Sequence, residues 1–254
     1  MTATSETGEL SWSQRWTTWL RERTTVRSGR EYWEGTFPAI SEEIMKLDRN
    51  MRITPRFVAD HDLFTLESIS GMTEEAVAAL RSEGFIHNGK WNAPVGPAAL
   101  DFVDRHHLSE LVSELTGVDV EEPQGATYIA YFEAGGHLDF HLDDFHYGEV
   151  NLIICLRHVV PDSTRNPSAT VFIQSGGYRS CPLETGSFVL FDGAFTPHGR
   201  TPLAEGEEVI LVSFSFKTKS RALWNVQDAP SAPPTRDEIE AAGTTIGAGA
   251  GNGN

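Results

Sequence analysis

Cysteine is almost absent from this sequence, which has only Cys155 and Cys181 among 254 residues. Two cysteines indicate neither a disulfide framework nor a cysteine-based zinc site. Long apolar runs are also missing, since none approaches the ~18 residues that a membrane-spanning helix needs. The residues from Met1 to Glu6 contain no basic region and no apolar core. We therefore expect no secretion signal, no membrane partner and a cytoplasmic protein.

Positive charge is scarce as well. Lys and Arg number 20 against 36 Asp and Glu, which gives a formal net charge of −16. An acidic chain repels the phosphates of nucleic acid, so nucleic acid is not expected as a partner. The same charge can attract a cationic or zwitterionic small molecule, although it more often serves solubility alone.

The first 123 residues are predicted to be mainly helical, because apolar residues recur there every three to four positions. Thr73 is a suitable N-cap and Gly84 a suitable stop for one helix. Pro97 suits the first turn of another helix, which Gly117 ends. The predicted elements are helices at 10–23, 40–47, 73–84 and 97–117 and a strand at 51–57.

From residue 124 the hydrophobic period changes from 3.6 to 2, which is typical of strands. Short strands separated by turn residues favour a sandwich or barrel. After Trp224 the composition becomes rich in Pro, Ala and Gly, so 225–254 is predicted to be a flexible tail. The chain as a whole is predicted to form one structural domain. The predicted strands are 126–133, 149–157, 169–174, 187–192 and 208–217.

A candidate metal site follows the first of these strands. Gly135-Gly136 forms a turn, and His141 and Asp143 follow it, separated by one residue. In extended backbone, side chains two residues apart point to the same face, so both can hold one metal ion. His198, which follows the strand at 187–192, is the best candidate for a third ligand. Two His and one carboxylate leave three open positions, the arrangement of non-haem Fe(II) oxygenases.

A second pair, His137 and Asp139, has the same spacing. Because Gly135-Gly136 directly precedes His137, little strand remains to orient its side chain. We therefore predict His141 and Asp143 as the ligands. The candidates for substrate contacts near the pocket mouth are His137, Asp144 and Trp224.

Two groups of residues resemble the signature of the Fe(II)/2-oxoglutarate-dependent dioxygenases, over roughly residues 124–220. The first group is Tyr131, Gly136, Leu138, His141 and Asp143, and the second is Phe191 followed by His198-Gly-Arg-Thr-Pro202. The resemblance implies a mainly β fold with α-helices. Its core would be a double-stranded β-helix, or jelly roll, at 124–224, buttressed by the helices of 1–123. It also implies Fe(II) as the metal and 2-oxoglutarate and O2 as co-substrates.

The resemblance further implies an oxidoreductase that hydroxylates an unactivated C–H bond of a small molecule. The chain is similar to small bacterial oxygenases that act on free amino acids or other building blocks of specialised metabolites, including radical halogenases. Those halogenases lack the carboxylate ligand. Since Asp143 is present here, hydroxylation is the expected outcome.

The anchor for 2-oxoglutarate departs from the family pattern. The family normally places Arg or Lys about ten residues after the distal His, where this chain has Glu208. Arg200 is the natural substitute, because it is two residues after His198 and guanidinium binds carboxylates bidentately. Lys217 is the second choice and shares strand parity with Ser213; Tyr131 completes the predicted co-substrate contacts. Glu208 also keeps an alternative open, a cupin-like metal-binding module or isomerase that does not use 2-oxoglutarate.

Overall fold

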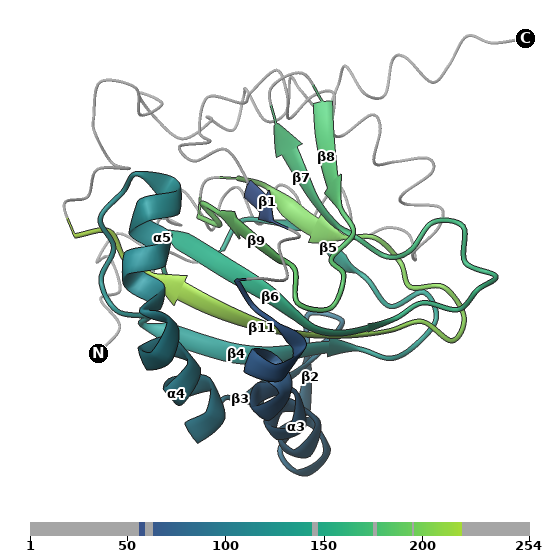
Figure 1. Ribbon diagram of the computed structural model, residues 1–254. Coiled ribbons are helices and arrows are strands. Elements are labelled where there is room, and N and C mark those ends of the chain that lie inside the picture. Colours follow the sequence, from purple (N-terminus) through teal and green to yellow (C-terminus); the bar gives the residue numbers. More distant parts are fainter. Residues whose placement is uncertain (1–55, 59–62, 144–146, 175–176, 195, 220–254) are drawn as a thin grey trace, which may run out of the picture.

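The computed structural model describes residues 56–58, 63–143, 147–174, 177–194 and 196–219 (Figure 1). Several predictions concern residues outside these ranges. They are the helices at 10–23 and 40–47, most of the strand at 51–57, the tail at 225–254 and the candidates Asp144 and Trp224.

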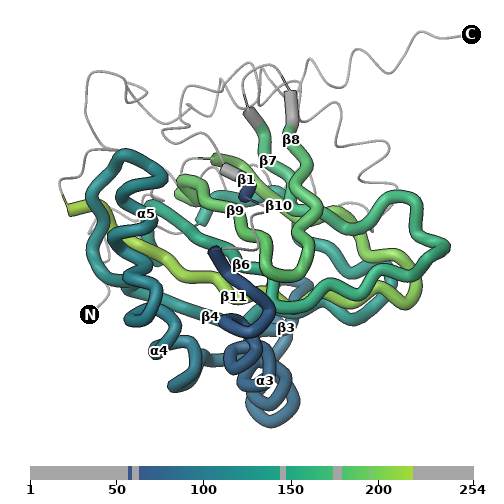
Figure 2. The backbone as a smooth tube through the Cα atoms, viewed as in Figure 1, coloured from purple at the N-terminus to yellow at the C-terminus, as the bar shows by residue number. Residues whose placement is uncertain are grey.

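Eight antiparallel strands form a double-stranded β-helix (Figures 1 and 2). Four of them lie in a large sheet and four in a small sheet, and successive strands mostly alternate between the two. The large-sheet strands are β4 (Gly125–Tyr131), β6 (Val150–Val159), β9 (Phe188–Phe191) and β11 (Glu208–Phe216). The small-sheet strands are β5 (Leu138–His141), β7 (Thr170–Gln174), β8 (Gly177–Cys181) and β10 (His198–Arg200). The predicted jelly roll and all five of its predicted strands are confirmed.

Three further strands widen the large sheet. They are β1 (Arg56–Val58), β2 (Phe85–His87) and β3 (Lys90–Pro94), and the full order is β1-β9-β6-β11-β4-β3-β2. The small sheet has the order β5-β10-β7-β8. The prediction that the first 123 residues are mainly helical did not include β2 and β3, which lie between the predicted helices at 73–84 and 97–117. Asn88 and Gly89 both have positive φ and join these strands by a two-residue turn, a hairpin signal that the helical pattern had hidden.

Helices cover the outer face of the large sheet, as predicted. They are α3 (Leu66–Ser82), α4 (Pro97–His106) and α5 (Leu108–Thr116), and Figure 1 shows them on the opposite side of this sheet from β5, β7 and β8. Along β11, Val212 and Phe214 pack in the cluster that includes helix residues, while Val209 and Leu211 pack against the small sheet. The two-residue period of the strand therefore divides the core into an outer and an inner layer.

The starts and breaks of the helices differ from the predictions. Thr65, not Thr73, caps α3, and its hydroxyl accepts a hydrogen bond from the Ser68 amide at 3.1 Å. Thr73 lies within the helix, where its hydroxyl donates to the Ile69 carbonyl. The predicted helix at 97–117 is two helices, because His107 adopts a left-handed conformation with φ of 46°.

Glu75 on α3 ties the helical layer to the sheet. Its carboxylate accepts hydrogen bonds from the Gly96 and Ala98 amides at the start of α4, each at 2.8 Å, and from the Tyr128 hydroxyl on β4. A negative charge at a helix N-terminus is favourable because the helix dipole is positive there. Burial raises the pKa of Glu75, but the hydrogen bonds from Tyr128 and α4 outweigh burial and leave this pKa lowered.

Replacing Glu75 by Gln should lower the free energy of unfolding by about 1–3 kcal/mol at neutral pH. The NH2 group of the glutamine would face a hydrogen-bond donor where the carboxylate has an accepting oxygen. Since the folded-state pKa is lowered, the carboxylate stabilises the fold above the ordinary value of 4.5 and loses this effect as the pH falls through the folded value. The difference between Glu75→Gln and wild type in urea unfolding should therefore shrink in acid. Glu74→Gln, at an exposed neighbour, is the matched control. An equal loss in both variants would contradict the capping role.

Candidate metal centre

The pairing of β10 with β5 brings distant parts of the chain together. His198 lies directly opposite His141 in this pair, and Arg200 lies opposite Leu138 after a shift in register. Asp143 follows β5, and its amide donates to the Gly193 carbonyl at 2.9 Å. The three predicted ligands therefore come from one strand pair and the loop attached to it.

The ligand atoms of His141, Asp143 and His198 all lie within 4.8 Å of one another. Nε2 of His141 is 3.4 Å from Oδ1 of Asp143, and Nε2 of His198 is 3.5 Å from Oδ2 of the same carboxylate. Atoms this close can share one ion, since bonds from such a metal to nitrogen and oxygen are about 2.0–2.2 Å long. In the described part of the chain, no other group of three potential ligands comes this close.

Both imidazole rings are oriented by backbone carbonyls. Nδ1 of His141 is 2.9 Å from the Asp139 carbonyl, and Nδ1 of His198 is 3.0 Å from the Thr196 carbonyl. Because a carbonyl only accepts, each Nδ1 carries the proton and each Nε2 presents its lone pair. Both lone pairs are thus available to a metal beside Asp143.

Asp143 is held by residues that the sequence did not single out. The Asn151 side-chain amide donates to Oδ2 of Asp143. A Cβ at Gly193 would overlap both this oxygen and the Asn151 nitrogen, so only glycine fits there. No local motif marks Asn151 or Gly193, because their role arises only when β6 and the loop after β9 meet.

The charges around the site favour metal binding. Burial lowers the pKa of His198 to about 4, with the charges of His141 and Lys90 acting in the same direction against the attraction of Asp143. Burial raises the pKa of Asp143, but attraction to His198, His141 and Lys90 leaves it lowered. At neutral pH the site therefore contains a neutral His198 imidazole and an ionised carboxylate, the forms that coordinate a metal.

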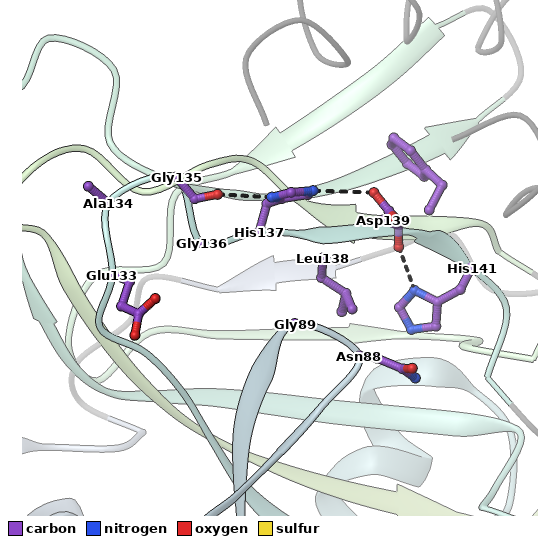
Figure 3. A pocket seen from close by; sticks show the side chains of 11 residues that line it. Asn88, Gly89, Glu133, Ala134, Gly135, Gly136, His137, Leu138, Asp139 and His141 are labelled. Atoms are coloured by element: carbon purple, nitrogen blue, oxygen red, sulfur yellow. Dashed lines mark hydrogen bonds and ion pairs between the residues drawn. The ribbon is translucent and has the colours of Figure 1, made fainter. Parts of the chain in front are cut away.

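The second His–Asp pair is arranged differently. Nε2 of His137 is 3.4 Å from Oδ1 of Asp139, and Nδ1 of His137 is 2.9 Å from the Gly135 carbonyl (Figure 3). The hydrogen bond to Asp139 is the largest influence on the pKa of His137 and raises it, in opposition to burial. This pair is not part of the three-ligand group.

A pocket of about 570 Å³ opens beside His141. The segment from Glu133 to His141 forms one wall, and the turn residues Asn88 and Gly89 approach it from the β2–β3 hairpin (Figure 3). His137, a predicted substrate contact, is among the residues that line this pocket.

Arg200 and Tyr131 lie together between the two sheets. Arg200 is 2% exposed, and its guanidinium carbon is 5.4 Å from the centre of the buried Tyr131 ring. It donates to the Ser168 carbonyl at 3.2 Å, while its Nε–H has no hydrogen-bond partner. Among the described residues, no carboxylate lies within ion-pair distance of it. Burial lowers the pKa of Arg200, but arginine remains a cation in proteins.

Ser213 and Lys217 occupy other parts of β11. Ser213 is buried in the middle of the strand, and its hydroxyl accepts a hydrogen bond from the Tyr147 hydroxyl at 3.4 Å. Lys217 follows the last residue of β11, whereas Tyr131 pairs with Val209 at the other end of that strand. Lys217 and Arg200 are therefore associated with opposite ends of β11.

Glu208 does not face the site, although it is the residue ten positions after His198 where the family places its basic anchor. Its carboxylate forms an exposed ion pair with Arg157 at 3.3 Å, while the next residue, Val209, packs inward. The negative charge thus faces solvent and does not oppose a bound anion. The objection to 2-oxoglutarate that Glu208 raised in the sequence is removed.

Comparison with known proteins supports the fold. No family model and no curated protein matches the sequence. A prolyl-4-hydroxylase from Pseudomonas putida matches with a TM-score of 0.52 and 14% identity, over 70% of this chain and 96% of that one. An oxidoreductase of the 2OG-Fe(II) oxygenase family from Burkholderia pseudomallei matches with a TM-score of 0.50 and 11% identity, over 71% and 90%.

A third structure, HygX from Streptomyces hygroscopicus with nickel, 2-oxoglutarate and hygromycin B bound, matches with a TM-score of 0.51 and 10% identity, over 69% of this chain and 86% of that one. The chain therefore has the double-stranded β-helix fold of the 2-oxoglutarate- and Fe(II)-dependent oxygenases. The resemblance noted in the sequence is confirmed at the level of the fold.

No helix in the described part of the chain has both the length and the apolar character needed to cross a membrane.

His141→Ala and His198→Ala should each abolish binding of a divalent metal while the fold remains, because each removes one of three donors. Metal content after purification with Fe(II) or Zn(II) measures this, and the circular dichroism spectrum monitors the fold. His137→Ala is the matched control and should bind metal like the wild type. Metal loss in His137→Ala with retention in His141→Ala would assign the site to the other pair.

Proposed function

We propose that the protein is an Fe(II)- and 2-oxoglutarate-dependent oxygenase that hydroxylates an unactivated C–H bond of a small molecule. The observation that carries this proposal is the convergence of His141, Asp143 and His198 within 4.8 Å, in a fold shared with such oxygenases. The alternative of a cupin-like module without 2-oxoglutarate rested on Glu208, and that side chain pairs with Arg157 in solvent.

The donor set fits Fe(II). Imidazole and carboxylate ligands suit this ion, and three protein ligands leave open positions. Neither cysteine belongs to the ligand group, and burial raises the pKa of the Cys155 thiol to about 12, so no thiolate competes as a ligand. When bound, Fe(II) supplies the oxidation of the substrate by O2 together with conversion of 2-oxoglutarate to succinate and CO2. The chain contributes the three ligands and the orientation of both organic substrates.

Arg200 is proposed to hold the far carboxylate of 2-oxoglutarate. It follows His198 by two residues on β10, so it lies about 6.5–7 Å further along the strand on the same face. A buried cation without a partner is costly, and a carboxylate that approaches its free Nε–H would offset that cost. Thr170, whose hydroxyl is 3.5 Å from Arg200, and Tyr131 offer further hydroxyl groups beside the guanidinium.

Ser213 and Lys217 are retained as weaker co-substrate candidates. Ser213 lies among buried polar groups with Tyr147, whose pKa burial raises to about 12, so the phenol stays protonated and can donate. Lys217 follows the C-terminal end of β11, whereas Tyr131 pairs with Val209 near the N-terminal end of that strand. The order of preference is therefore Arg200, then Lys217.

The wild-type protein should form succinate from 2-oxoglutarate when Fe(II) and O2 are supplied. Arg200→Ala should raise the KM for 2-oxoglutarate at least tenfold, because loss of a charge-assisted pair costs about 1.5–3 kcal/mol. Arg157→Ala, which removes an exposed arginine, is the matched control and should leave the KM unchanged. An unchanged KM in Arg200→Ala with a raised KM in Lys217→Ala would move the anchor to Lys217.

The substrate is proposed to be a free amino acid or another building block of specialised metabolism, and the product should gain oxygen, not halogen. His141, Asp143 and His198 would together hold Fe(II) and would leave three open positions, enough for 2-oxoglutarate and O2 but not for chloride as well. Mass spectrometry of a metabolite mixture incubated in chloride buffer should show a product heavier by one oxygen atom. A chlorinated product from the wild type would overturn hydroxylation, and full activity in Asp143→Gly would show that Asp143 is not a ligand.

A further inference from the structure

A short series of hydrogen bonds connects Arg200 to a buried carboxylate outside the metal centre. Nη2 of Arg200 donates to the Ser168 carbonyl at 3.2 Å, and the Ser168 amide donates to Oε1 of Glu207 at 2.7 Å. Glu207 directly precedes β11, and its side chain is fully buried. Arg200 and Glu207 are therefore joined through a single residue, Ser168.

The Ser168 carbonyl helps to set the direction of the Arg200 guanidinium. Among the described residues, the guanidinium donates to two acceptors, and Ser168 is the nearer, since the Thr170 hydroxyl is 3.5 Å from Nη1. Because a guanidinium is planar, these two contacts also fix the direction of the Nε–H, which has no partner. On the proposed function this is a group that the far carboxylate of 2-oxoglutarate meets. The position of Ser168 therefore bears on co-substrate affinity.

Ser168 is held from two sides. Its hydroxyl donates to the Thr201 carbonyl at 2.7 Å, and the Ala169 amide donates to the Thr201 hydroxyl at 2.8 Å. These bonds tie the segment to the residue that follows Arg200. Glu207 holds the other side by accepting the Ser168 amide. Since Ser168 is fully buried, its amide would lose its acceptor without Glu207, and the backbone would have to move to satisfy it.

Glu207 is itself fixed by further donors. The Ala204 amide donates to Oε2 at 2.7 Å, and Nε2 of His158 lies 2.7 Å from Oε1. Nδ1 of His158 is 2.7 Å from the Leu183 carbonyl, which only accepts, so this nitrogen carries a proton. A carboxylate with contacts on both oxygens has little freedom to move. It is thus a rigid support for Ser168.

His158 also keeps Glu207 from neutralising Arg200. Nε2 of His158 and Oε1 of Glu207 lie 2.7 Å apart, so a proton lies between them, and the pair is neutral in total whichever atom carries it. Burial lowers the pKa of Arg200, and Glu207 is the smallest of three influences in the other direction, after Tyr131 and Cys155. The charge of Arg200 is therefore left without a counter-ion.

We propose that Glu207 is a positioning residue for the 2-oxoglutarate anchor. It holds Ser168, whose carbonyl orients the Arg200 guanidinium, and it acts on the co-substrate only through that arginine. The role rests on the proposed function and adds to it a residue that does not touch 2-oxoglutarate.

The test compares two 2-oxo acids on the full chain loaded with Mn(II), which replaces Fe(II) without turnover. 2-Oxoglutarate and 2-oxopentanoate share the metal-binding end, but only 2-oxoglutarate has a far carboxylate. Calorimetry gives the ratio of their dissociation constants, in which changes at the metal or in overall stability cancel. The wild type should prefer 2-oxoglutarate roughly tenfold or more, and Arg200→Ala should lose this preference.

Two substitutions separate reach from charge at Glu207. Glu207→Asp keeps the charge but is one methylene shorter, so the Ser168 amide loses its acceptor and the preference should fall roughly three- to tenfold. Glu207→Gln keeps the reach, and its oxygen should lie where the donors of Ser168 and His158 converge. Its preference should stay within about twofold of the wild type, the effect of less than one hydrogen bond. Its unfolding temperature should still fall, because the NH2 group faces the Ala204 amide.

Glu149→Asp is the matched control. Glu149 is also buried and accepts a backbone amide, that of Thr218 at 3.0 Å, beyond the opposite end of β11. This variant should keep the wild-type preference. Thermal unfolding verifies that each variant is folded, and Glu207→Met, which has the length without an acceptor, replaces Glu207→Asp if that variant is not.

A double variant tests whether Glu207 acts through Arg200. In the Arg200→Ala background, Glu207→Asp should not weaken 2-oxoglutarate binding further, because the group that it positions is absent. A purely structural role would weaken binding in both backgrounds.

Four results would overturn the inference. They are an unchanged preference in Glu207→Asp, an equal loss in Glu207→Gln, an equal loss in Glu149→Asp, and a further loss of 2-oxoglutarate affinity in the double variant. Failure of the proposed function is distinguishable from these. A wild type that binds neither acid, or binds both equally, has no anchor at Arg200, which overturns the proposed co-substrate site and the role of Glu207 together.

Discussion

The pairing of β10 with β5 is the constraint on which the site depends. It places His198 opposite His141. In the loop that precedes β10, the Gly193 carbonyl accepts a hydrogen bond from the Asp143 amide. A slip of one residue in this register would turn His198 away from the inter-sheet space, because side chains alternate along a strand. The same loop is tied to β7, where the Ile173 amide donates to the Pro197 carbonyl. The metal ligands are thus held by backbone hydrogen bonds, which most substitutions leave intact.

The second determinant is the low polarity of the space between the sheets. Apolar side chains such as Ile129, Leu211 and Phe172 pack there, so charges in this space are weakly screened. Arg200 is buried in it without an ion-pair partner among the described residues. A folded chain that retains such a cation has given up stability, and binding of an anion would recover it. This electrostatic argument, and not similarity of sequence, supports a carboxylate-containing co-substrate.

Elements outside the eight-stranded core extend the large sheet toward the pocket. The β2–β3 hairpin continues the large sheet beyond β4 and places Asn88 and Gly89 at the pocket. The packing of α3 and α4 on the outer face supports this region, since Glu75 joins both helices to Tyr128 of β4. The part of the chain that precedes the core therefore does more than buttress it, because its hairpin also lines the pocket.

The sequence by itself determined five main strands, because strand periodicity is a local pattern, and it offered His141 and Asp143 through their two-residue spacing. The jelly roll was implied by the family resemblance. The sequence also marked His198, through a resemblance to a family motif. Only the tertiary structure decided that Glu208 pairs with Arg157 in solvent and that Asn151 and Gly193 lie against Asp143. A side chain's face depends on the strand register and on the surface that covers it, and both are set by segments far away in the chain. Asn88-Gly89 shows what a local pattern leaves open. The two residues are a hairpin signal in the sequence, but only the folded chain places them at the pocket, opposite the segment from Glu133 to His141.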